Sequence, residues 1–400
     1  MNRSESVPVI TYHSVGRRIP GWCWNDLTTP WRCFERHLHA LSRARYYTAT
    51  LSELHDHVAG VSPLPKRSVV LTFDDGYLDN WTFVSPLLEE HGMRGTVFVT
   101  PDFVDPRDVV RSTLAEVRNG RLPVDKLEVA GFMSWAELRA ASERGTLIPQ
   151  CHALTHTWYP VSDTVVDFHF PGDNRYWLDW NAHPSTKPFY LRNPTSSSVA
   201  YGTPVYEHAK SLECTRFFPD PDEAAALAEF VAGHGAQAIF SERGWRDRLY
   251  TELARYRASH PRRGRLETPD ERSARFVAEL DESRQQIEER VGVTVRHIVW
   301  PGGGNHPEVV QMARQRYLSA PVSSEQRWQL WNTPGDDPFE LSRRGVPSVE
   351  FCRRIVWPAG AYLIDTLEEF CGSIRARRRR QVRKLFYMAS AILNGGEPAA

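Results

Sequence analysis

The chain has 400 residues, of which 41% are hydrophobic and 24% are charged, and this ordinary composition excludes a disordered or fibrous protein. Lys and Arg together number 49, as do Asp and Glu, so no net charge attracts nucleic acid to the surface as a whole. The sequence has no apolar stretch of about 18 residues and no apolar signal core near its start, which predicts neither a membrane-spanning helix nor export.

Short β-branched runs alternate with helical patterns through the first third of the sequence. Strands are expected at residues 7–12, 68–73, 95–100 and 146–151. Helices are expected at residues 31–43, 78–91 and 134–144, the last beginning with a capping box between Ser134 and Glu137. Such alternation is typical of a parallel sheet, either open or closed into a barrel.

The pattern changes after residue 159. Residues 160–220 are rich in proline, aromatic and polar residues and contain few regular runs. Helical patterns follow at 222–233, 243–259 and 269–291, and a strand pattern returns at 295–300. We interpret residues 160–270 as an insertion into the sheet domain.

A pair of carboxylates follows the strand expected at 68–73. In residues 72–76 (TFDDG), Asp74 and Asp75 point in different directions, because successive side chains alternate along a strand. One carboxylate could bind a cation while the other acts as a base. Alternatively, the pair belongs to an ordinary surface turn that caps the next helix.

Two further motifs also follow strand patterns. In residues 151–156 (CHALTH), His152 and His156 could converge on the cation, although two polar loop histidines are the simpler alternative. The glycines of residues 300–305 (WPGGGN) permit close approach of the backbone to a ligand. All three motifs would lie at the carboxyl ends of parallel strands, where α/β sheets and barrels build their sites.

Together with the opening VPVITYHSV, these motifs resemble those of the polysaccharide deacetylase family, the NodB-homology family or carbohydrate esterase family four. The likeness covers about residues 5–157 and 270–350. It implies an α/β fold, a distorted (β/α) barrel with a large insertion after the second metal motif. The parts would be a first barrel segment (1–159), an inserted substrate-recognition region (160–270), a completing segment (271–350) and an extension with a basic helix (351–400).

The resemblance also implies a site and an activity. Asp75, His152 and His156 would hold a divalent metal, usually zinc, although such a ligand set also accepts Co, Ni, Mn or Fe. Asp74 would be the general base for removing an N-acyl group, expected to be acetyl, from an amino sugar in glycan or cell-surface polysaccharide biosynthesis. A non-sugar amide hydrolase, an O-acetyl esterase and a non-catalytic glycan-binding protein remain alternatives.

Two positions depart from the family pattern. Val299 stands where the family often has an arginine that pairs with the base, and residues 341–343 (Leu-Ser-Arg) replace the Leu-x-His phrase that supplies the general acid. A guanidinium stays charged near neutral pH and cannot donate the proton. We expect His13 to be the acid, with His306 as the second candidate, although either could be a structural histidine.

Saccharide contacts are expected from the third motif, the insertion and the Leu-Ser-Arg phrase. Aromatic faces stack on pyranose rings and charged neighbours bind hydroxyls or phosphates, although aromatic packing within the insertion is the plain alternative. The candidate substrate-binding residues are Trp300, Pro301, Gly302, Arg343, Trp177, Trp180 and Arg175.

The last part of the chain is strongly basic. Seven Lys and Arg residues lie within 375–384, followed by the largely apolar run LFYMASAIL. Residues 375–393 could lie on an anionic membrane surface, although a solvated basic terminus is the simpler alternative. We expect an amino-sugar glycan as partner and no specific nucleic acid. The expected location is the cytoplasm, with a peripheral position on the inner membrane face if the tail binds lipid.

Overall fold

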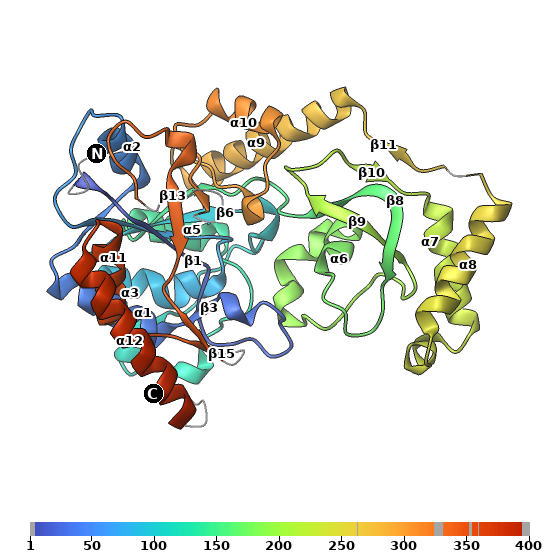
Figure 1. Ribbon diagram of the computed structural model, residues 1–400, viewed down its shortest axis with the longest axis horizontal. Coiled ribbons are helices and arrows are strands. Elements are labelled where there is room, and N and C mark those ends of the chain that lie inside the picture. Colours follow the sequence, from blue (N-terminus) through green and yellow to red (C-terminus); the bar gives the residue numbers. More distant parts are fainter. Residues whose placement is uncertain (1–4, 262, 324–330, 352–353, 359, 394–400) are drawn as a thin grey trace.

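Parallel strand segments form the core of the part of the molecule on the left of Figure 1. The computed structural model describes residues 5–261, 263–323, 331–351, 354–358 and 360–393. Its main sheet runs in the order β12 (Val322–Ser323), β13 (Ser342–Gly345), β1 (Val9–Tyr12), β5 (Ser68–Phe73), β6 (Gly95–Val99) and β7 (Leu147–Cys151). A short strand, β4 (Tyr47–Ala49), pairs with the start of β5.

Two isolated parallel bridges connect the ends of this sheet. Cys151 at the end of β7 pairs with Ile298, and the neighbouring His297 pairs with Ser319, which leads into β12. Since β12 pairs in parallel with β13, the ring closes, as the resemblance implied. The strand expected at 295–300 is reduced to these bridges, because the Gln150 side chain accepts the backbone N–H groups of residues 296 and 297.

Apolar side chains fill the interior of the ring. Val9, Val70, Phe98, Val299 and Leu341 come from five different segments of the ring and belong to a single buried cluster. Residues on all sides of a ring can share a cluster only by pointing inward. Side chains two residues further along a strand point the same way, so this inward face continues to the rim of the barrel.

Helices surround the ring and cover its outer face. They are α1 (Trp31–Arg43), α3 (Ser85–Glu90), α4 (Leu114–Arg118), α5 (Trp135–Glu143), α9 (Pro269–Val291) and α10 (Pro307–Arg314). Helix α2 (Leu51–Val58) instead packs against the interior cluster through Leu51, Leu54 and Val58. The helix expected at 78–91 contains a π-helical turn, Asn80–Val84, immediately before α3. Ser134 and Glu137 form the expected capping box at the start of α5.

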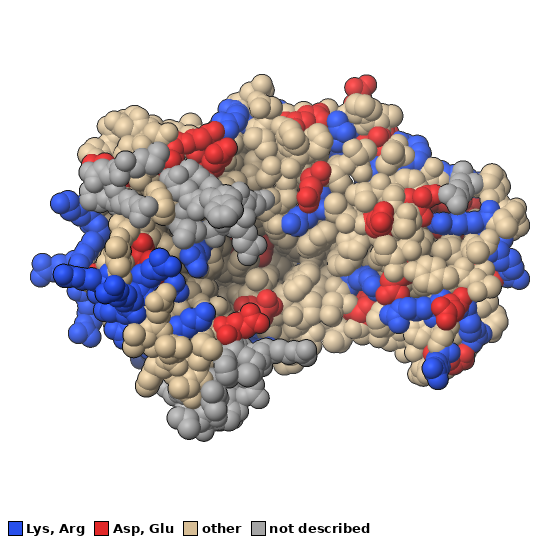
Figure 2. All heavy atoms as spheres, viewed as in Figure 1, with Lys and Arg blue, Asp and Glu red and all other residues tan. Residues whose placement is uncertain are grey.

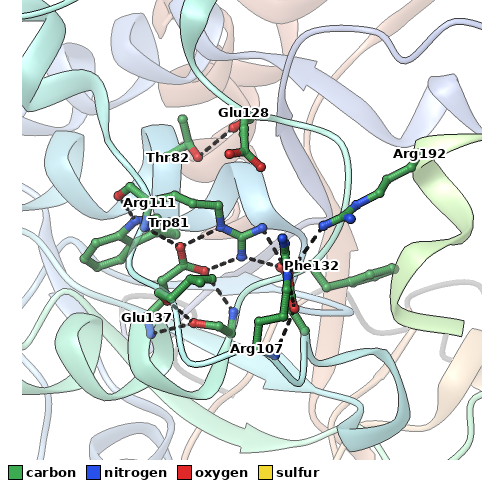
Figure 3. Close-up of polar contacts among 11 residues, drawn as sticks. Trp81, Thr82, Arg107, Arg111, Glu128, Phe132, Glu137 and Arg192 are labelled. Carbon is green, nitrogen blue, oxygen red and sulfur yellow. Dashed lines mark hydrogen bonds and ion pairs between the residues drawn. The ribbon is translucent and has the colours of Figure 1, made fainter. Parts of the chain in front are cut away.

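A buried ion-pair network fixes the segment that connects β6 to α5. Arg111 donates to both carboxylate oxygens of Glu137, at 2.8 and 2.6 Å, and to the Phe132 carbonyl at 2.8 Å (Figure 3). Its own carbonyl accepts a hydrogen bond from the Trp81 indole. The Phe132 ring, held in this way, stacks on Phe103 with ring centroids 4.6 Å apart. The network thus positions aromatic side chains beneath the mouth of the barrel.

The insertion forms the lobe on the right of Figure 1. An antiparallel pair, β8 (Trp158–Phe168) and β9 (Pro204–Lys210), leads from it to the barrel, so the expectation of few regular runs at 160–220 is wrong. The pattern was hidden by Pro160 and by register shifts within β8. The lobe's remaining elements are α6 (Tyr176–Ala182), the 3₁₀ helix Pro184–Arg192, β10 (Phe217–Phe218), α7 (Pro221–Gly233), α8 (Trp245–Ser259) and β11 (Arg265–Leu266).

The chain ends on the opposite side of the barrel from this lobe (Figure 1). There α11 (Gly360–Phe370) packs on α1 and α12 (Ile374–Leu393) packs on α11. Gly360 permits this contact, because a Cβ atom there would lie 2.4 Å from the Arg36 carbonyl oxygen. Two small strand pairs complete the structure, β2 (Ser14–Gly16) with β3 (Thr28–Pro30) and β14 (Val349–Phe351) with β15 (Arg354–Val356).

Candidate active site

A cleft of about 740 Å³ lies at the mouth of the barrel, between the strand ends and the insertion. The barrel side contributes His13, Asp74, Asp75 and His152, which directly follow strands, and Arg343, which lies within β13. The insertion side contributes the aromatic residues Trp158, Trp180 and Tyr190 together with Lys210. The cleft is large enough for several sugar rings.

Asp75, His152 and His156 converge on one point in this cleft. The Nε2 atoms of both histidines lie 3.3 Å from Oδ1 of Asp75, and one potential ligand atom from each residue lies within 4.8 Å of the others. The two imidazole rings are 5.0 Å apart between centroids. The spacing leaves room for one ion at the centre of the three atoms.

The contacts of these side chains fit a metal ligand set. Nδ1 of His152 donates to the Val299 carbonyl at 2.8 Å, which leaves the lone pair of Nε2 facing the site. Oδ1 of Asp75 is buried and has no hydrogen-bond partner among the described residues. A buried carboxylate oxygen beside two imidazole nitrogens is the donor chemistry that zinc and similar divalent ions select.

The backbone is strained where these ligands are presented. Asp75, Ala153 and His156 adopt positive φ angles of 72°, 57° and 44°, which are costly for residues other than glycine. The loop that carries His156 is held from one side by Glu279 of α9, whose carboxylate accepts the backbone N–H groups of residues 154 and 155 at 2.9 and 3.0 Å.

An ammonium group from the insertion also holds this loop. Lys187 is almost fully buried and donates to the Thr155 carbonyl and, at 3.2 Å, to Asp102. Burial lowers the pKa of Lys187, although the nearby carboxylates partly offset this effect. The insertion therefore helps to fix the loop of His156, a candidate metal ligand, and also forms a wall of the cleft.

Asp74 lies beside the ligand set and is bound by a guanidinium. Arg343 donates from Nη1 and Nη2 to the two carboxylate oxygens at 2.7 and 2.8 Å. The alternation of the strands explains the pairing, since Asp74 shares the inward face with Val70, and Arg343 shares it with Leu341. Burial alone would raise the pKa of Asp74, but the charge and hydrogen bonds of Arg343 outweigh it and the pKa is lowered.

This pairing accounts for both departures noted in the sequence. Arg343 occupies the position where a proton donor was expected and supplies the charge that an arginine at position 299 would have supplied. Arg343 was predicted to bind substrate; it does line the cleft, but its two terminal nitrogens are directed at Asp74. We therefore interpret it as a positioning residue.

The two histidines considered as proton donors lie in different places. His13 lines the cleft, with Nε2 3.9 Å from Oδ2 of Asp74, and its side chain is 32% exposed. His306 instead caps the N-terminus of α10, where Nδ1 accepts the Glu308 N–H at 3.2 Å. The geometry therefore favours His13.

The predicted substrate-binding residues are also divided. Trp300, Gly302 and Trp180 line the cleft together with Arg343. Among the described residues, those that line the cleft do not include Pro301, Trp177 or Arg175. The Arg175 guanidinium binds Asp173 and Asp167 at 2.9 and 2.7 Å within the insertion, so its charge is neutralised there.

Lys210 is a cleft residue that the sequence did not indicate. Its ammonium donates to the Gly302 carbonyl across the cleft, which joins β9 to the glycine turn. A Cβ atom at Gly302 would lie 2.8 Å from Cε of Lys210, and one at Gly304 would lie 2.7 Å from its Cδ. The glycines therefore admit the lysine side chain as well as the positive φ of Gly302.

Glu279, in contrast, left a signal in the sequence. It shares a helical stripe with Phe276, Leu280 and Ile287, all of which are buried. A carboxylate on an otherwise apolar face must have a partner to offset its burial. The hydrogen bonds to the histidine loop supply that partner.

The fold and site together define a class of protein. Two imidazoles and a carboxylate at the carboxyl ends of a closed parallel ring, next to a carboxylate base, form the arrangement of a metal-dependent hydrolase. Residues 62–175 match the family model described as polysaccharide deacetylase. The chain therefore resembles the polysaccharide deacetylase family over this region, which contains Asp74, Asp75, His152 and His156.

Curated relatives match this chain over part of their length. The chain is 32% identical over 97 residues to "Putative polysaccharide deacetylase YxkH" of Bacillus subtilis (strain 168), covering 24% of this chain and 33% of that protein. It is 27% identical over 147 residues to the poly-beta-1,6-N-acetyl-D-glucosamine N-deacetylase of Escherichia coli (strain K12), covering 36% and 18%. The chain thus spans a third or less of the length of these relatives.

A solved structure is similar over most of the chain. It is a de-N-acetylase from Aggregatibacter actinomycetemcomitans, with a TM-score of 0.49 and 16% sequence identity. The similarity covers 85% of this chain and 94% of that one.

Proposed function

We propose that this protein is a metal-dependent hydrolase that removes N-acetyl groups from amino sugars of a polysaccharide. The observation that carries the proposal is the convergence of Asp75, His152 and His156 beside a carboxylate that is kept ionised by Arg343. A non-catalytic protein would have no need to combine a ligand set with a positioned base. The name of the Escherichia coli relative supports an N-acetylglucosamine polymer as the substrate.

The ligand set supplies the electrophilic part of the chemistry. When bound by Asp75, His152 and His156, a divalent ion, zinc by preference, acidifies a water molecule and polarises the acyl carbonyl. The strained backbone and the two loop contacts keep the three side chains oriented for this ion.

The remaining steps belong to residues of the chain. Asp74 accepts the proton of the attacking water, and Arg343 holds its carboxylate in one orientation for that transfer. His13, which is partly exposed to the cleft, donates a proton to the departing sugar nitrogen. Base and acid then follow the neighbouring strands β5 and β1, and both side chains line the cleft in which the scissile amide would bind.

The aromatic wall provides the sugar-binding surface. Trp158 and Trp180 have ring centroids 6.1 Å apart, and Trp24 lies 6.2 Å from Trp158. These rings can pack against the apolar faces of pyranose units while Lys210 and Asp26 bind hydroxyl groups.

Product analysis tests the proposal directly. We expect zinc-loaded protein to convert N-acetylated β-1,6-linked glucosamine oligosaccharides into products that each lack an acetyl group, detected by mass spectrometry together with free acetate. The Asp75→Ala variant is the control and should give no product. Release of acetate only from O-acetylated sugars would support an esterase, and zinc-loaded protein that binds the oligosaccharide without converting it would support a binding protein.

A further inference from the structure

The C-terminal helix α12 has two chemically different faces. On the face that contacts α11, Arg379 and Arg383 bind Asp365 with N–O distances of 2.6 and 2.8 Å. Arg380 on the same face binds Glu369. These three guanidinium groups are neutralised within the protein, so they stabilise the packing of the two helices.

The outward face carries cations that are not neutralised. Arg375, Arg378 and Lys384 are exposed and have no carboxylate partner within the described part of the chain. Figure 2 shows the resulting group of basic side chains at the left edge of the molecule, on the side of α11 and α12. The seventh basic residue of 375–384, Arg377, lies 3.8 Å from Glu369 and so belongs with the paired set.

Large apolar side chains lie among these outward cations. Ile374, Val382, Leu385 and Phe386 are 70%, 68%, 66% and 71% exposed. They are four of the eleven large hydrophobic side chains that are exposed in the described part of the chain. With 100° per residue, the four apolar side chains, Arg375 and Arg378 fall within about 120° of the helix circumference, outside the arc of the residues that bind α11. Lys384 lies about 80° beyond the edge of this arc, and only its long side chain brings the ammonium toward the same surface. Such a concentration of exposed apolar surface on one helix indicates a partner.

We propose that α12 docks on a membrane surface rich in anionic lipid, with its axis in the plane of the interface. The apolar side chains would enter the boundary of the acyl chains while Arg375, Arg378 and Lys384 bind lipid phosphates. None of the described helices is long and apolar enough to cross a membrane. Docking is independent of the proposed hydrolytic activity, which lies in the cleft.

Two other partners fit these side chains less well. A nucleic acid would bind the cations but leave the apolar side chains in water. A second copy of the chain would cover the apolar side chains, but a two-fold contact would bring two sets of unneutralised cations together. An anionic lipid surface satisfies both features.

Vesicle co-sedimentation of the full chain tests this docking. We expect binding to vesicles of phosphatidylglycerol and phosphatidylcholine, no binding to phosphatidylcholine alone, and weaker binding at high salt. The combined variant Arg375→Glu, Arg378→Glu and Lys384→Glu should bind at least about a hundredfold less tightly, because each cation near the surface contributes to binding.

A matched variant separates this site from general attraction between charges. Lys66, Lys126 and Arg243 are exposed, lie on other elements and form no ion pair with a described residue. Reversing these three charges to Glu changes the net charge by the same amount and should leave vesicle binding unchanged. Equal losses in the two triple variants would overturn the proposal.

The apolar part is tested by the variant Leu385→Ser and Phe386→Ser. Vesicle binding should fall about tenfold or more, while the control Val61→Ser and Val110→Ser, also exposed, should bind as the unchanged protein does. If the protein binds single-stranded RNA as tightly as vesicles, and the apolar variant keeps this RNA binding, the surface is assigned to nucleic acid. If the unchanged protein forms a dimer and does not bind vesicles, and the apolar variant is a monomer, the surface is assigned to a second copy of the chain. Either result overturns the proposal.

Discussion

The two walls of the cleft are built in different ways. On the barrel wall, polar side chains from the ends of short buried strands converge. Asp75 adopts a strained positive φ angle there, and Asp74 is paired with Arg343. On the insertion wall, Trp158 begins β8 and Tyr190 lies in the 3₁₀ helix Pro184–Arg192, and both rings pack mainly against other aromatic rings.

This difference indicates a division of work between chemistry and recognition. The barrel wall fixes a few atoms closely, which a reaction requires. The insertion wall offers broad apolar faces, which suit binding of sugar rings. Lys187 is the exception, because it comes from the insertion but holds the metal-ligand loop. Substitutions on the two walls should therefore affect different kinetic constants.

The largest effect is expected from Asp74→Asn on the barrel wall. The amide cannot accept the proton of the attacking water, so kcat should fall by about a thousandfold or more. Metal content, measured by plasma mass spectrometry, should stay near one ion per chain. The control Asp26→Asn changes another cleft carboxylate in the same way and should have a much smaller effect. Full turnover by Asp74→Asn would remove it from the role of base.

A somewhat smaller loss is expected from His13→Gln. Without a proton donor to the sugar nitrogen, kcat should fall about a hundredfold, measured as the rate of acetate release at saturating oligosaccharide. His306→Gln is the matched control, because that side chain caps α10 outside the cleft. If the control loses activity and His13→Gln does not, the two assignments are reversed.

A smaller effect, with a distinct pH signature, is expected from Arg343→Lys. The guanidinium lowers the pKa of Asp74 against the effect of burial, so replacing its two hydrogen bonds should raise that pKa. Because Asp74 acts as a base when ionised, the acidic limb of the kcat profile should move to higher pH. At the optimum, kcat should fall by about ten- to a hundredfold, because the carboxylate loses its fixed orientation. An unshifted limb would contradict the positioning role.

The smallest effect is expected on the insertion wall. Trp158→Ala should raise KM for long oligosaccharides about tenfold and leave kcat nearly unchanged, because the ring contributes to binding before and during the reaction alike. Trp177→Ala is the control, since Trp177 is not one of the described residues that line the cleft. A fall in kcat with unchanged KM would mean that this wall takes part in the chemistry.

Much of the barrel wall could be predicted from the sequence. Buried strand patterns such as residues 68–73 predict their own conformation, and the motifs directly after them place Asp75 and His152 at the same rim. The pairing of Arg343 with Asp74 could not be predicted in this way, because the two residues are 269 positions apart and meet only through closure of the ring.

The insertion wall was much less predictable. Proline and polar residues conceal the β8–β9 pair, and no periodicity reveals that Lys210 crosses the cleft to the glycine turn. Aromatic composition alone suggested Trp177 and Trp180 equally, although only Trp180 lines the cleft among the described residues. The cytoplasmic location and the absence of a specific nucleic-acid partner stay predictions.

The most direct test of the account is an anomalous-diffraction experiment on crystals of the zinc-loaded protein. We predict one strong zinc peak in the cleft, within about 2.0–2.2 Å of Nε2 of His152, Nε2 of His156 and Oδ1 of Asp75. A cleft without zinc, or an ion bound by other residues, would contradict the shared metal site on which the proposed chemistry depends.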